Sequence, residues 1–341
     1  IGKNAFRDCG NLTKVTIPEG VRTIGLGAFY GCIGLKSIVI PEGVKAIGLG
    51  AFYRCTALTE VTIPKGVKTI EWNTFRNCSV LKSVTIPEGV ETIGGWAFGH
   101  CTGLTSVAIP ASVKTIDERA FCDCASLKSI TIPDSVKTIG GWAFHGCTSL
   151  TELTIPGGVD GEWWVFCGCT GLNSVVISKG VRTIGWREFA GCTGLKSITI
   201  PTSVKKISKG AFDGCIALTE VAIPGKVETI QWGAFKGCTG LKSITLSSGV
   251  KTIEGSAFAG CTDLTSVAIP ASVKTIEERA FAGCTSLTTV TIPASVKKME
   301  GDVFEGCTGL TIQAPAGSVA ETYAKKNNIP FETETPPSEN N

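Results

Sequence analysis

Residues 104–126 read LTSVAIPASVKTIDERAFCDCAS, and variants of this stretch recur along nearly the whole chain of 341 residues. Leu104 belongs to a column of 14 leucines whose successive members lie 23 residues apart, except for one step of 22. Columns of 14 phenylalanines and 14 cysteines keep the same spacing, as Phe121 and Cys124 do in the quoted unit. A fixed period of this length indicates one array of stacked repeats rather than two or three globular domains.

The apolar residues of one unit predict its local structure. Val107 and Ile109 alternate with small or polar residues, as a half-buried strand requires. Pro110 has no N–H to donate and therefore ends the strand. Val113 and Ile116 then return apolar side chains to the interior. One unit cannot bury its apolar edge alone, so neighbouring units must stack and share a continuous core.

The full pattern, L-x-x-V-x-I-P-x-x-V-x-x-I-x-x-x-A-F-x-x-C, recurs from residue 1 to about residue 332. It resembles the bacterial surface leucine-rich-repeat family of the BspA, or Treponema, type. This resemblance implies a mostly β, α/β-type repeat: a right-handed leucine-rich-repeat solenoid with a parallel concave sheet. It also implies a secreted or cell-surface protein of adhesion and recognition. The partner would then be a protein or glycan of a host or neighbouring cell.

The last part of the chain departs from the repeat. The stretch TIQAPAGSVAETYAKKNNIPFE resembles the terminal cap of the same family. Ser318 is suited to N-cap a short helix, and Pro330 to end it. We therefore expect a solenoid of about 13 full repeats over residues 1–311, a helical cap over 312–332 and a polar linker tail over 333–341. Ile1 falls inside a repeat, so we expect the natural N-terminus to be missing.

Composition argues against several classes of function. The net charge is only +3, and the basic residues recur at fixed repeat positions, so we predict solvated faces and no nucleic-acid partner. No apolar stretch reaches 18 residues, so no membrane insertion is expected. His100 and His145 are the only histidines, and neither has a recognisable orienting acid in its own repeat. No phosphate-binding loop is present, and we predict a protein that is not an enzyme and needs no cofactor.

The cysteine column has two interpretations. So many cysteines would ordinarily indicate disulfides, but stacking in register makes neighbouring Cβ vectors parallel, whereas a disulfide needs a dihedral angle near 90°. We therefore predict reduced, buried cysteines that pack as small apolar residues with a weak S–H donor. Cys122 and Cys167 lie outside this column, directly after a column Phe, and His145 occupies that position in the repeat between them. A zinc site at these three residues is an alternative to chance variation.

The repeats differ most just before and just after the column Phe. All seven tryptophans fall two or three residues before a Phe; they are Trp72, Trp96, Trp142, Trp163, Trp164, Trp186 and Trp232. Positions that also accept Gly, Glu, Lys and Arg must face solvent. We therefore predict a ligand-binding surface made of these tryptophans and Arg187, in an extracellular binding scaffold. The alternatives are that each Trp fills the hole above a neighbouring Gly, and that the chain is a structural spacer or surface-layer component.

The single 22-residue step, from Leu150 to Leu172, predicts a local irregularity. The eight residues VDGEWWVF of 159–166 replace the nine residues of a unit such as VKTIGGWAF. Asp160, Gly161 and Glu162 fill the region where the other repeats place a core Ile. We expect the coil formed by residues 156–169 to lack part of the regular packing.

Overall fold

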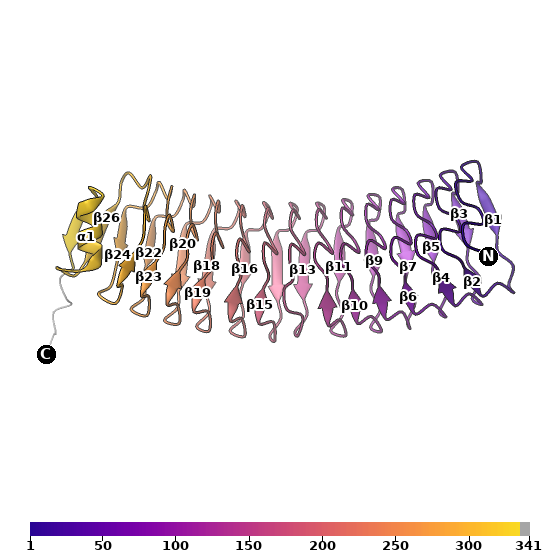
Figure 1. Ribbon diagram of the computed structural model, residues 1–341, viewed down its shortest axis with the longest axis horizontal. Coiled ribbons are helices and arrows are strands. Elements are labelled where there is room, and N and C mark those ends of the chain that lie inside the picture. Colours follow the sequence, from indigo (N-terminus) through magenta and orange to yellow (C-terminus); the bar gives the residue numbers. More distant parts are fainter. Residues whose placement is uncertain (335–341) are drawn as a thin grey trace. The chain divides into compact units, whose positions relative to one another are not determined.

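The computed structural model describes residues 1–334, so the part of the expected linker at 335–341 lies outside the described residues. The chain forms two compact units, Ile1–Val181 and Arg182–Asn341. Each unit is a parallel β-solenoid in which one 23-residue repeat makes one coil (Figure 1). The expectation of a mostly β leucine-rich-repeat solenoid is confirmed, because residues 1–334 form many short strands and one short helix near the C-terminus.

One column of strands is formed by the V-x-I part of the repeats, where the apolar residue between two exposed ones is buried. In unit 1 these strands are β1 (Lys14–Thr16), β3 (Ser37–Val39), β5 (Glu60–Thr62), β7 (Ser83–Thr85), β9 (Ser106–Ala108), β11 (Ser129–Thr131), β13 (Glu152–Ile155) and β14 (Ser174–Ile177). In unit 2 they are β16 (Ser197–Thr199), β18 (Glu220–Ile223), β20 (Ser243–Leu246), β22 (Ser266–Ala268), β24 (Thr289–Thr291) and β26 (Thr311–Ala314).

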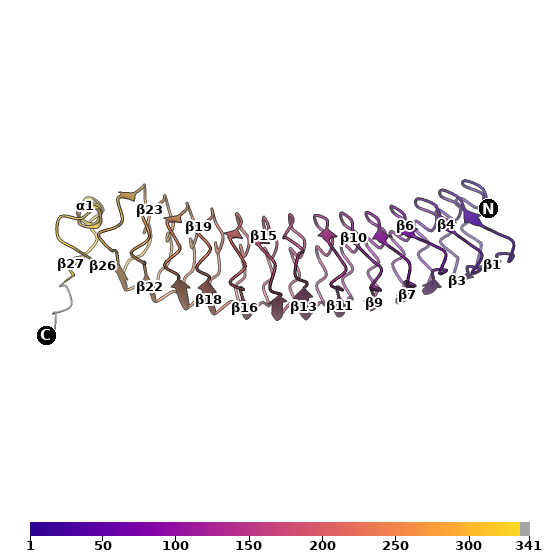
Figure 2. The same cartoon turned by 90° about the horizontal axis from the view of Figure 1, so that it is seen from below.

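A second column consists of two-residue strands that end on the second core position of each repeat, and Figure 2 shows the two columns on separate edges of the coils. In unit 1 these strands are β2 (Thr23–Ile24), β4 (Ala46–Ile47), β6 (Thr69–Ile70), β8 (Thr92–Ile93), β10 (Thr115–Ile116) and β12 (Thr138–Ile139). In unit 2 they are β15 (Thr183–Ile184), β17 (Lys206–Ile207), β19 (Thr229–Ile230), β21 (Thr252–Ile253), β23 (Thr275–Ile276) and β25 (Lys298–Met299).

Backbone hydrogen bonds hold the coils in register. Strands β9 and β11 pair in parallel with Val107 opposite Ile130, which is one full repeat away. On the far side of the coil, the N–H of Phe98 donates to the carbonyl of Ala120 in the next coil at 2.8 Å. Because the pairing step equals the repeat length, each residue type stacks on its own counterpart.

The phenylalanine column is the clearest result of this register. Consecutive rings lie nearly parallel with centroids 5.1–5.5 Å apart, as Phe29 does against Phe52 and Phe235 against Phe258. Both phenylalanines of each of these two pairs are fully buried. Burial of a Phe side chain contributes about 1.5–3 kcal/mol relative to exposure, so the column is a large part of the stabilisation in each unit.

The cysteine column is buried and contains no disulfide, as the sequence predicts. All 16 cysteines lie within the described residues; none is disulfide-bonded, and only Cys9 is exposed. Thiols of the column donate to the carbonyl of the Phe in the preceding coil; Cys101 Sγ, for example, lies 3.1 Å from Phe75 O. That carbonyl also accepts the N–H of Cys78 in its own coil, so the thiol links two coils.

The 22-residue coil lacks its second-column strand, which confirms the predicted irregularity. No strand is formed between β13 and β14, where Asp160 and Glu162 are exposed. Val159 and Val165 are both buried and keep the core closed there without the missing Ile. The second-column sheet of unit 1 accordingly ends at β12.

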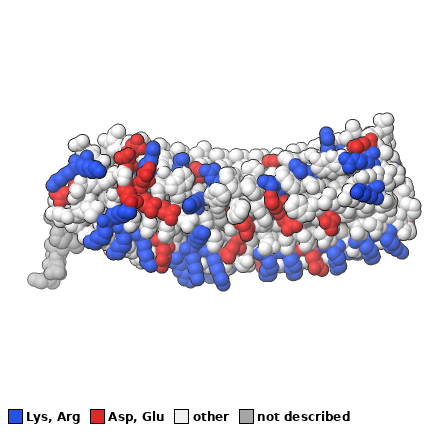
Figure 3. All heavy atoms as spheres, in the orientation of Figure 1, with Lys and Arg blue, Asp and Glu red and all other residues white. Residues whose placement is uncertain are grey.

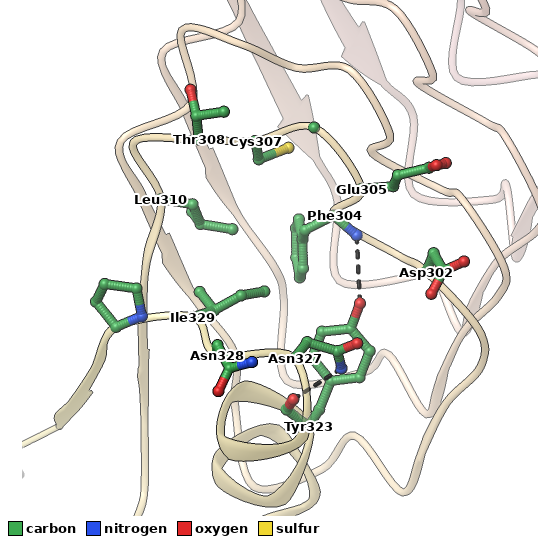
Figure 4. Close-up of a pocket in the computed structure, with 12 residues that line it drawn as sticks. Asp302, Phe304, Glu305, Cys307, Thr308, Leu310, Tyr323, Asn327, Asn328 and Ile329 are labelled. Atoms are coloured by element: carbon green, nitrogen blue, oxygen red, sulfur yellow. Dashed lines mark hydrogen bonds between the residues drawn. The ribbon is translucent and has the colours of Figure 1, made fainter.

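The C-terminal cap closes unit 2. Helix α1 (Val319–Lys326) begins at Ser318, whose side chain accepts the N–H of Glu321 at 3.2 Å, as the sequence predicts. Tyr323 packs edge-on against Phe304, with centroids 6.1 Å apart, and so ends the stack of parallel rings (Figure 4). The sequence did not predict strand β27 (Phe331–Thr333), which pairs with β26 and extends the sheet.

The buried thiols predict a loss of stability in alkaline solution. Burial raises the pKa of Cys32 to about 11 and the pKa of Cys261 to about 12, whereas an unfolded Cys has a pKa of about 8.5. Below about pH 8.5 both states keep their thiols protonated and the stability is fully present. Between that pH and the folded pKa values only the unfolded chain ionises, so stability falls as the pH rises.

Thermal unfolding in a reducing buffer measures this loss, and we expect the midpoint to fall steeply between pH 8 and 11. The control replaces Cys101, Cys124, Cys215 and Cys238 by Ala. That variant starts at a lower midpoint, because it loses the thiol contacts, but its midpoint should fall less over the same pH range. An equal fall in both proteins would contradict the explanation.

The missing strand predicts locally faster amide exchange. Amides of residues 159–165 should exchange with solvent deuterium faster than those of 136–142, the equivalent segment one coil earlier, which contains β12. Hydrogen exchange read out by mass spectrometry resolves segments of this length. Equal protection in the two segments would show that the 22-residue coil is as stable as its neighbour.

Candidate binding surface

Four tryptophans lie three residues before the column Phe, and all are exposed. The exposed fractions are 43% for Trp72, 56% for Trp163, 46% for Trp186 and 45% for Trp232. We call these four residues the outer Trp column. The rings of Trp72 and Trp232 also cover glycines: a Cβ built on Gly95 would lie 2.7 Å from ring atoms of Trp72, and one on Gly255 would lie 3.2 Å from Trp232. At these two residues, exposure of the ring and covering of a neighbouring glycine therefore occur together.

The other three tryptophans, two residues before the Phe, sit on an unusual backbone. Trp96, Trp142 and Trp164 have φ of 57°, 57° and 59°, in the left-handed region, and their side chains are partly buried. We call them the inner Trp column. In other coils the same position holds Gly27, Gly50 or Asn73, residue types that adopt this conformation at low cost. The three tryptophans therefore adopt a left-handed conformation that is sterically unfavourable for a bulky residue.

Arginines alternate with the inner tryptophans in unit 1. The Arg76 guanidinium lies 3.8 Å from the centroid of Trp96, and that of Arg119 lies 5.2 Å from Trp96 and 4.4 Å from Trp142. Trp142 in turn stacks on Trp164 with centroids 6.2 Å apart. These contacts form a cation–π ladder in which the ring faces are occupied, so chiefly ring edges and indole N–H groups remain for a partner.

The ladder continues toward the N-terminus on residues that the sequence analysis did not select. Tyr30 and Tyr53, directly after the column Phe, stack with centroids 4.8 Å apart, and Arg7 lies over Tyr30 at 4.1 Å. Arg76 lies 5.9 Å from the centroid of Tyr53 and so belongs to both parts. The signal in the sequence was the run Arg, Tyr, Tyr, Arg at one repeat position in four successive coils.

Unit 2 carries Arg187 at the inner position, with φ of 50°. Arg187 forms an ion pair with Asp213 at 3.2 Å, and it is partly exposed. Trp232 of the outer column receives Lys236 over its ring at 5.6 Å. Unit 2 therefore combines its exposed tryptophans with charged neighbours.

The zinc alternative is not supported. Within residues 1–334, no three His, Cys, Asp or Glu side chains come together as a metal ion would require. Cys122 instead donates to Asp123 Oδ2 at 3.4 Å. The residues Cys122, His145 and Cys167 therefore share a repeat position without forming a ligand set.

His100 has an acidic neighbour in the next coil, where Asp123 Oδ2 lies 3.3 Å from its Nδ1. This contact joins two repeats and is consistent with the expectation that no acid of its own repeat orients the imidazole. Cys122 contacts the same carboxylate, and burial raises the pKa of its thiol to about 12, with the charge of Asp123 adding to the effect. Such a thiol is not an activated nucleophile.

Basic residues line the edge of the second-column strands in unit 1, and Figure 3 shows Lys and Arg gathered along that edge of the unit. In unit 1 the row consists of exposed residues directly after the core Val: Arg22, Lys45, Lys68, Lys114 and Lys137. Glu91 interrupts the row and lies 4.0 Å from Lys68. The row matches the solvated faces predicted from the regular spacing of the basic residues.

A cavity of about 290 Å³ lies between the last coil of unit 2 and the C-terminal cap (Figure 4). It is lined by residues that include Phe304, Leu310 and Tyr323. The Tyr323 hydroxyl already accepts the N–H of Phe304 at 3.4 Å, and Asn327 Nδ2 donates to the carbonyl of Tyr323 at 2.9 Å. These polar groups stabilise the cap itself.

Among residues 1–334, no helix has the length and apolar character that crossing a bilayer requires. The family model described as BspA type leucine rich repeat region matches six copies in this chain, over residues 1–125, 97–219 and 205–323. No curated protein matches the chain.

Solved structures of bacterial leucine-rich-repeat proteins resemble this chain along nearly its full length. A protein from Bacteroides ovatus is 29% identical, with a TM-score of 0.76, and the match covers 98% of this chain and 87% of that one. A leucine-rich cell surface protein from Faecalibacterium prausnitzii is 30% identical, with a TM-score of 0.52 and coverage of 98% and 86%. The pneumococcal vaccine antigen PcpA is 18% identical, with a TM-score of 0.51 and coverage of 95% and 80%, and shares the fold.

The left-handed backbone at the inner Trp column predicts that glycine substitutions are less destabilising there than alanine substitutions, the reverse of the usual order. Trp96→Ala should lower stability because the contacts to Arg76 and Arg119 are lost. Trp96→Gly should be more stable than Trp96→Ala by about 1 kcal/mol, because glycine adopts this φ without strain. Urea unfolding of the two variants measures the difference. At Trp72, whose φ is not positive, the order should reverse, and the same order at both sites would contradict the strain argument.

Proposed function

Because the chain belongs to the BspA-type leucine-rich-repeat family, we propose that it is an extracellular binding scaffold on the bacterial surface. It recognises a protein or glycan of a host or neighbouring cell through the tryptophans of the outer and inner columns in each unit. The cell-surface description of the Faecalibacterium prausnitzii relative supports this location. We propose no catalytic step, because the thiol beside the His100–Asp123 contact, that of Cys122, is not a reactive nucleophile.

The observation that carries this proposal is the backbone strain at the position two residues before the column Phe, where the inner Trp column and arginines of other coils lie. Trp96, Arg119, Trp142 and Trp164 occupy left-handed backbone in successive coils of unit 1, and Arg187 does so in unit 2. A residue other than Gly, Asn or Asp in this region costs about 1–3 kcal/mol. Gly or Asn would avoid that cost, as they do in other coils. Backbone strain of this kind concentrates at functional sites, where the side chain is needed for a purpose other than folding.

The outer Trp column supplies the contact area. Its rings are 43–56% exposed, whereas the rings of the inner column are held between arginines and each other. Exposed tryptophans and arginines are the residues that contribute most often to binding hot spots. Because each unit offers such a group in more than one coil, an extended partner can contact more than one of them within a unit and gain avidity.

A structural spacer is the second candidate, and one observation favours it. The ladder links one coil to the next, and Trp72 covers the backbone at Gly95, so these residues stabilise stacking even without a ligand. A spacer would need the aromatic groups for stability alone. The two functions therefore differ in what removal of the exposed rings should affect.

The test replaces the outer Trp column, Trp72, Trp163, Trp186 and Trp232, by Ala. We expect binding to glycan and protein arrays, and to cells, to fall by about 1–2 kcal/mol for each hot-spot residue. The thermal midpoint should change little, because these side chains are roughly half exposed. The corresponding variant for the inner column, Trp142→Ala with Trp164→Ala, should lose stability as well.

The control replaces three exposed apolar residues that lie just after members of the cysteine column. They are Ile33, Val80 and Ile216, whose exposed fractions are 54%, 43% and 47%. Replacing them by Ala removes apolar surface without touching the Trp columns. If this control weakens binding as much as the Trp variant does, general hydrophobic adhesion explains the result. If the Trp variant unfolds and the remaining folded fraction binds normally, the spacer function is correct.

A further inference from the structure

A hollow of about 210 Å³ opens on the N-terminal part of the ladder in unit 1. Leu26 and Leu49, at the outer position, line it and are 41% and 45% exposed. The stacked Tyr30 and Tyr53 line it as well. Two exposed leucines beside two tyrosine rings make an apolar surface of the kind that marks an interaction site.

Glycine at the inner position is what leaves this hollow open. Gly27 and Gly50, both with φ of 59°, line the hollow, as does Asn73 at the same position of the next coil. The three coils after that carry Trp96, Arg119 and Trp142 there, with side chains that fill the equivalent space. The inner position therefore accepts large side chains, and the hollow is open because this position holds glycine in these two coils.

Both ends of the hollow carry a cation. Arg7 lies at one end over Tyr30, and Arg76 lies at the other between Tyr53 and Trp96. Arg7 already has an acidic neighbour, since its Nε lies 3.4 Å from Asp8 Oδ2. Arg76 has no carboxylate partner among residues 1–334, and its Nε is buried without a hydrogen-bond acceptor. The charge at the Arg76 end is therefore the less compensated one.

The spacing of these groups defines the ligand. Arg7 and Arg76 are separated by three coils, or about 14 Å at about 4.8 Å per coil. An extended peptide rises about 3.3 Å per residue and turns alternate side chains to the same face. Residues i and i+4 of a strand therefore span about 13 Å, with i+2 between them on the same face. A cavity of about 150 Å³ already holds a benzene ring, so the hollow has room for one apolar side chain.

We propose that this hollow binds an extended polypeptide segment of the pattern acid–x–apolar–x–acid, lying across the coils, with its apolar side chain between Leu49 and Tyr53. The two carboxylates then meet Arg7 and Arg76. This inference rests on the proposed binding function and names one partner for part of the same face, a protein segment rather than a glycan. Charge complementarity at both ends and an apolar centre favour that partner.

A fluorescein-labelled peptide, Gly-Ser-Glu-Ser-Phe-Ser-Glu-Ser-Gly, is the probe, and fluorescence anisotropy with the intact chain is the measurement. We expect saturable binding that weakens by about tenfold when both Glu are replaced by Lys, or when Phe is replaced by Ser. A fourth peptide places the two Glu directly beside Phe, on the opposite face of the strand, and should bind as weakly as the Lys peptide.

Gly50→Trp should abolish binding by filling the hollow with a side chain that the inner position accepts elsewhere. The matched control is Gly233→Trp, at the same repeat position in unit 2 and with the same φ of 59°. That control should bind the probe normally. If Gly50→Trp does not fold, Gly50→Asn serves instead, because Asn4 and Asn73 occupy this position with φ of 56° and 57°. Arg76→Gln should weaken binding more than Arg7→Gln, whose charge is already shared with Asp8.

The inference is wrong if the probe does not bind at protein concentrations of about 1 mM, where even very weak complexes form. It is also wrong if Gly50→Trp and Gly233→Trp bind it equally well. The array experiment with the outer Trp column decides the proposed function separately. Loss of array binding in that variant, together with no binding of the peptide, would overturn the hollow as a peptide site and leave the binding scaffold standing.

Discussion

The structure depends on one constraint, the backbone hydrogen bonding that joins each coil to the next in a register of one repeat. Val107 pairs opposite Ile130 on one edge, and the Phe98 N–H reaches the Ala120 carbonyl on the other. Once this register is set, identical side chains must stack on one another. The same rule creates the column of phenylalanine rings and the column of thiols, and it also brings like charges into one exposed row.

That constraint explains why cysteine suits its column. The site is fully buried, and each thiol lies near the carbonyl of a Phe that already accepts a backbone N–H. A small residue with an apolar body and a weak donor fits such a place. Burial also keeps the thiol protonated, because the charged form loses its hydration there. The column is thus both a packing element and a set of bonds between coils.

The variable positions follow from the same register. Since the backbone at the inner position keeps a positive φ in most coils, each residue placed there has the same conformation and differs only in its side chain. Tryptophan and arginine at this position stack into a ladder, and glycine leaves a gap. Within each unit, the proposed binding face is therefore a series of filled and open positions on a uniform backbone. The proposed recognition of an extended partner fits this arrangement, because the groups recur along the stacking direction.

The sequence by itself determined the repeat, the core columns, the reduced state of the cysteines, the irregular coil and the helical cap. These features depend on periodicity and local chemistry, which a single chain displays in its letters. The ring stacking that orders Arg76, Trp96 and Arg119 was decided only by the tertiary structure, as was the contact of His100 with Asp123 in the next coil. The same holds for the hollow beside Tyr30 and Tyr53. Each of these arises between residues on different coils, and their geometry depends on the direction in which each side chain leaves its backbone. A repeat pattern predicts which residues share a column, whereas the sign of φ at the inner position decides which neighbours their side chains meet.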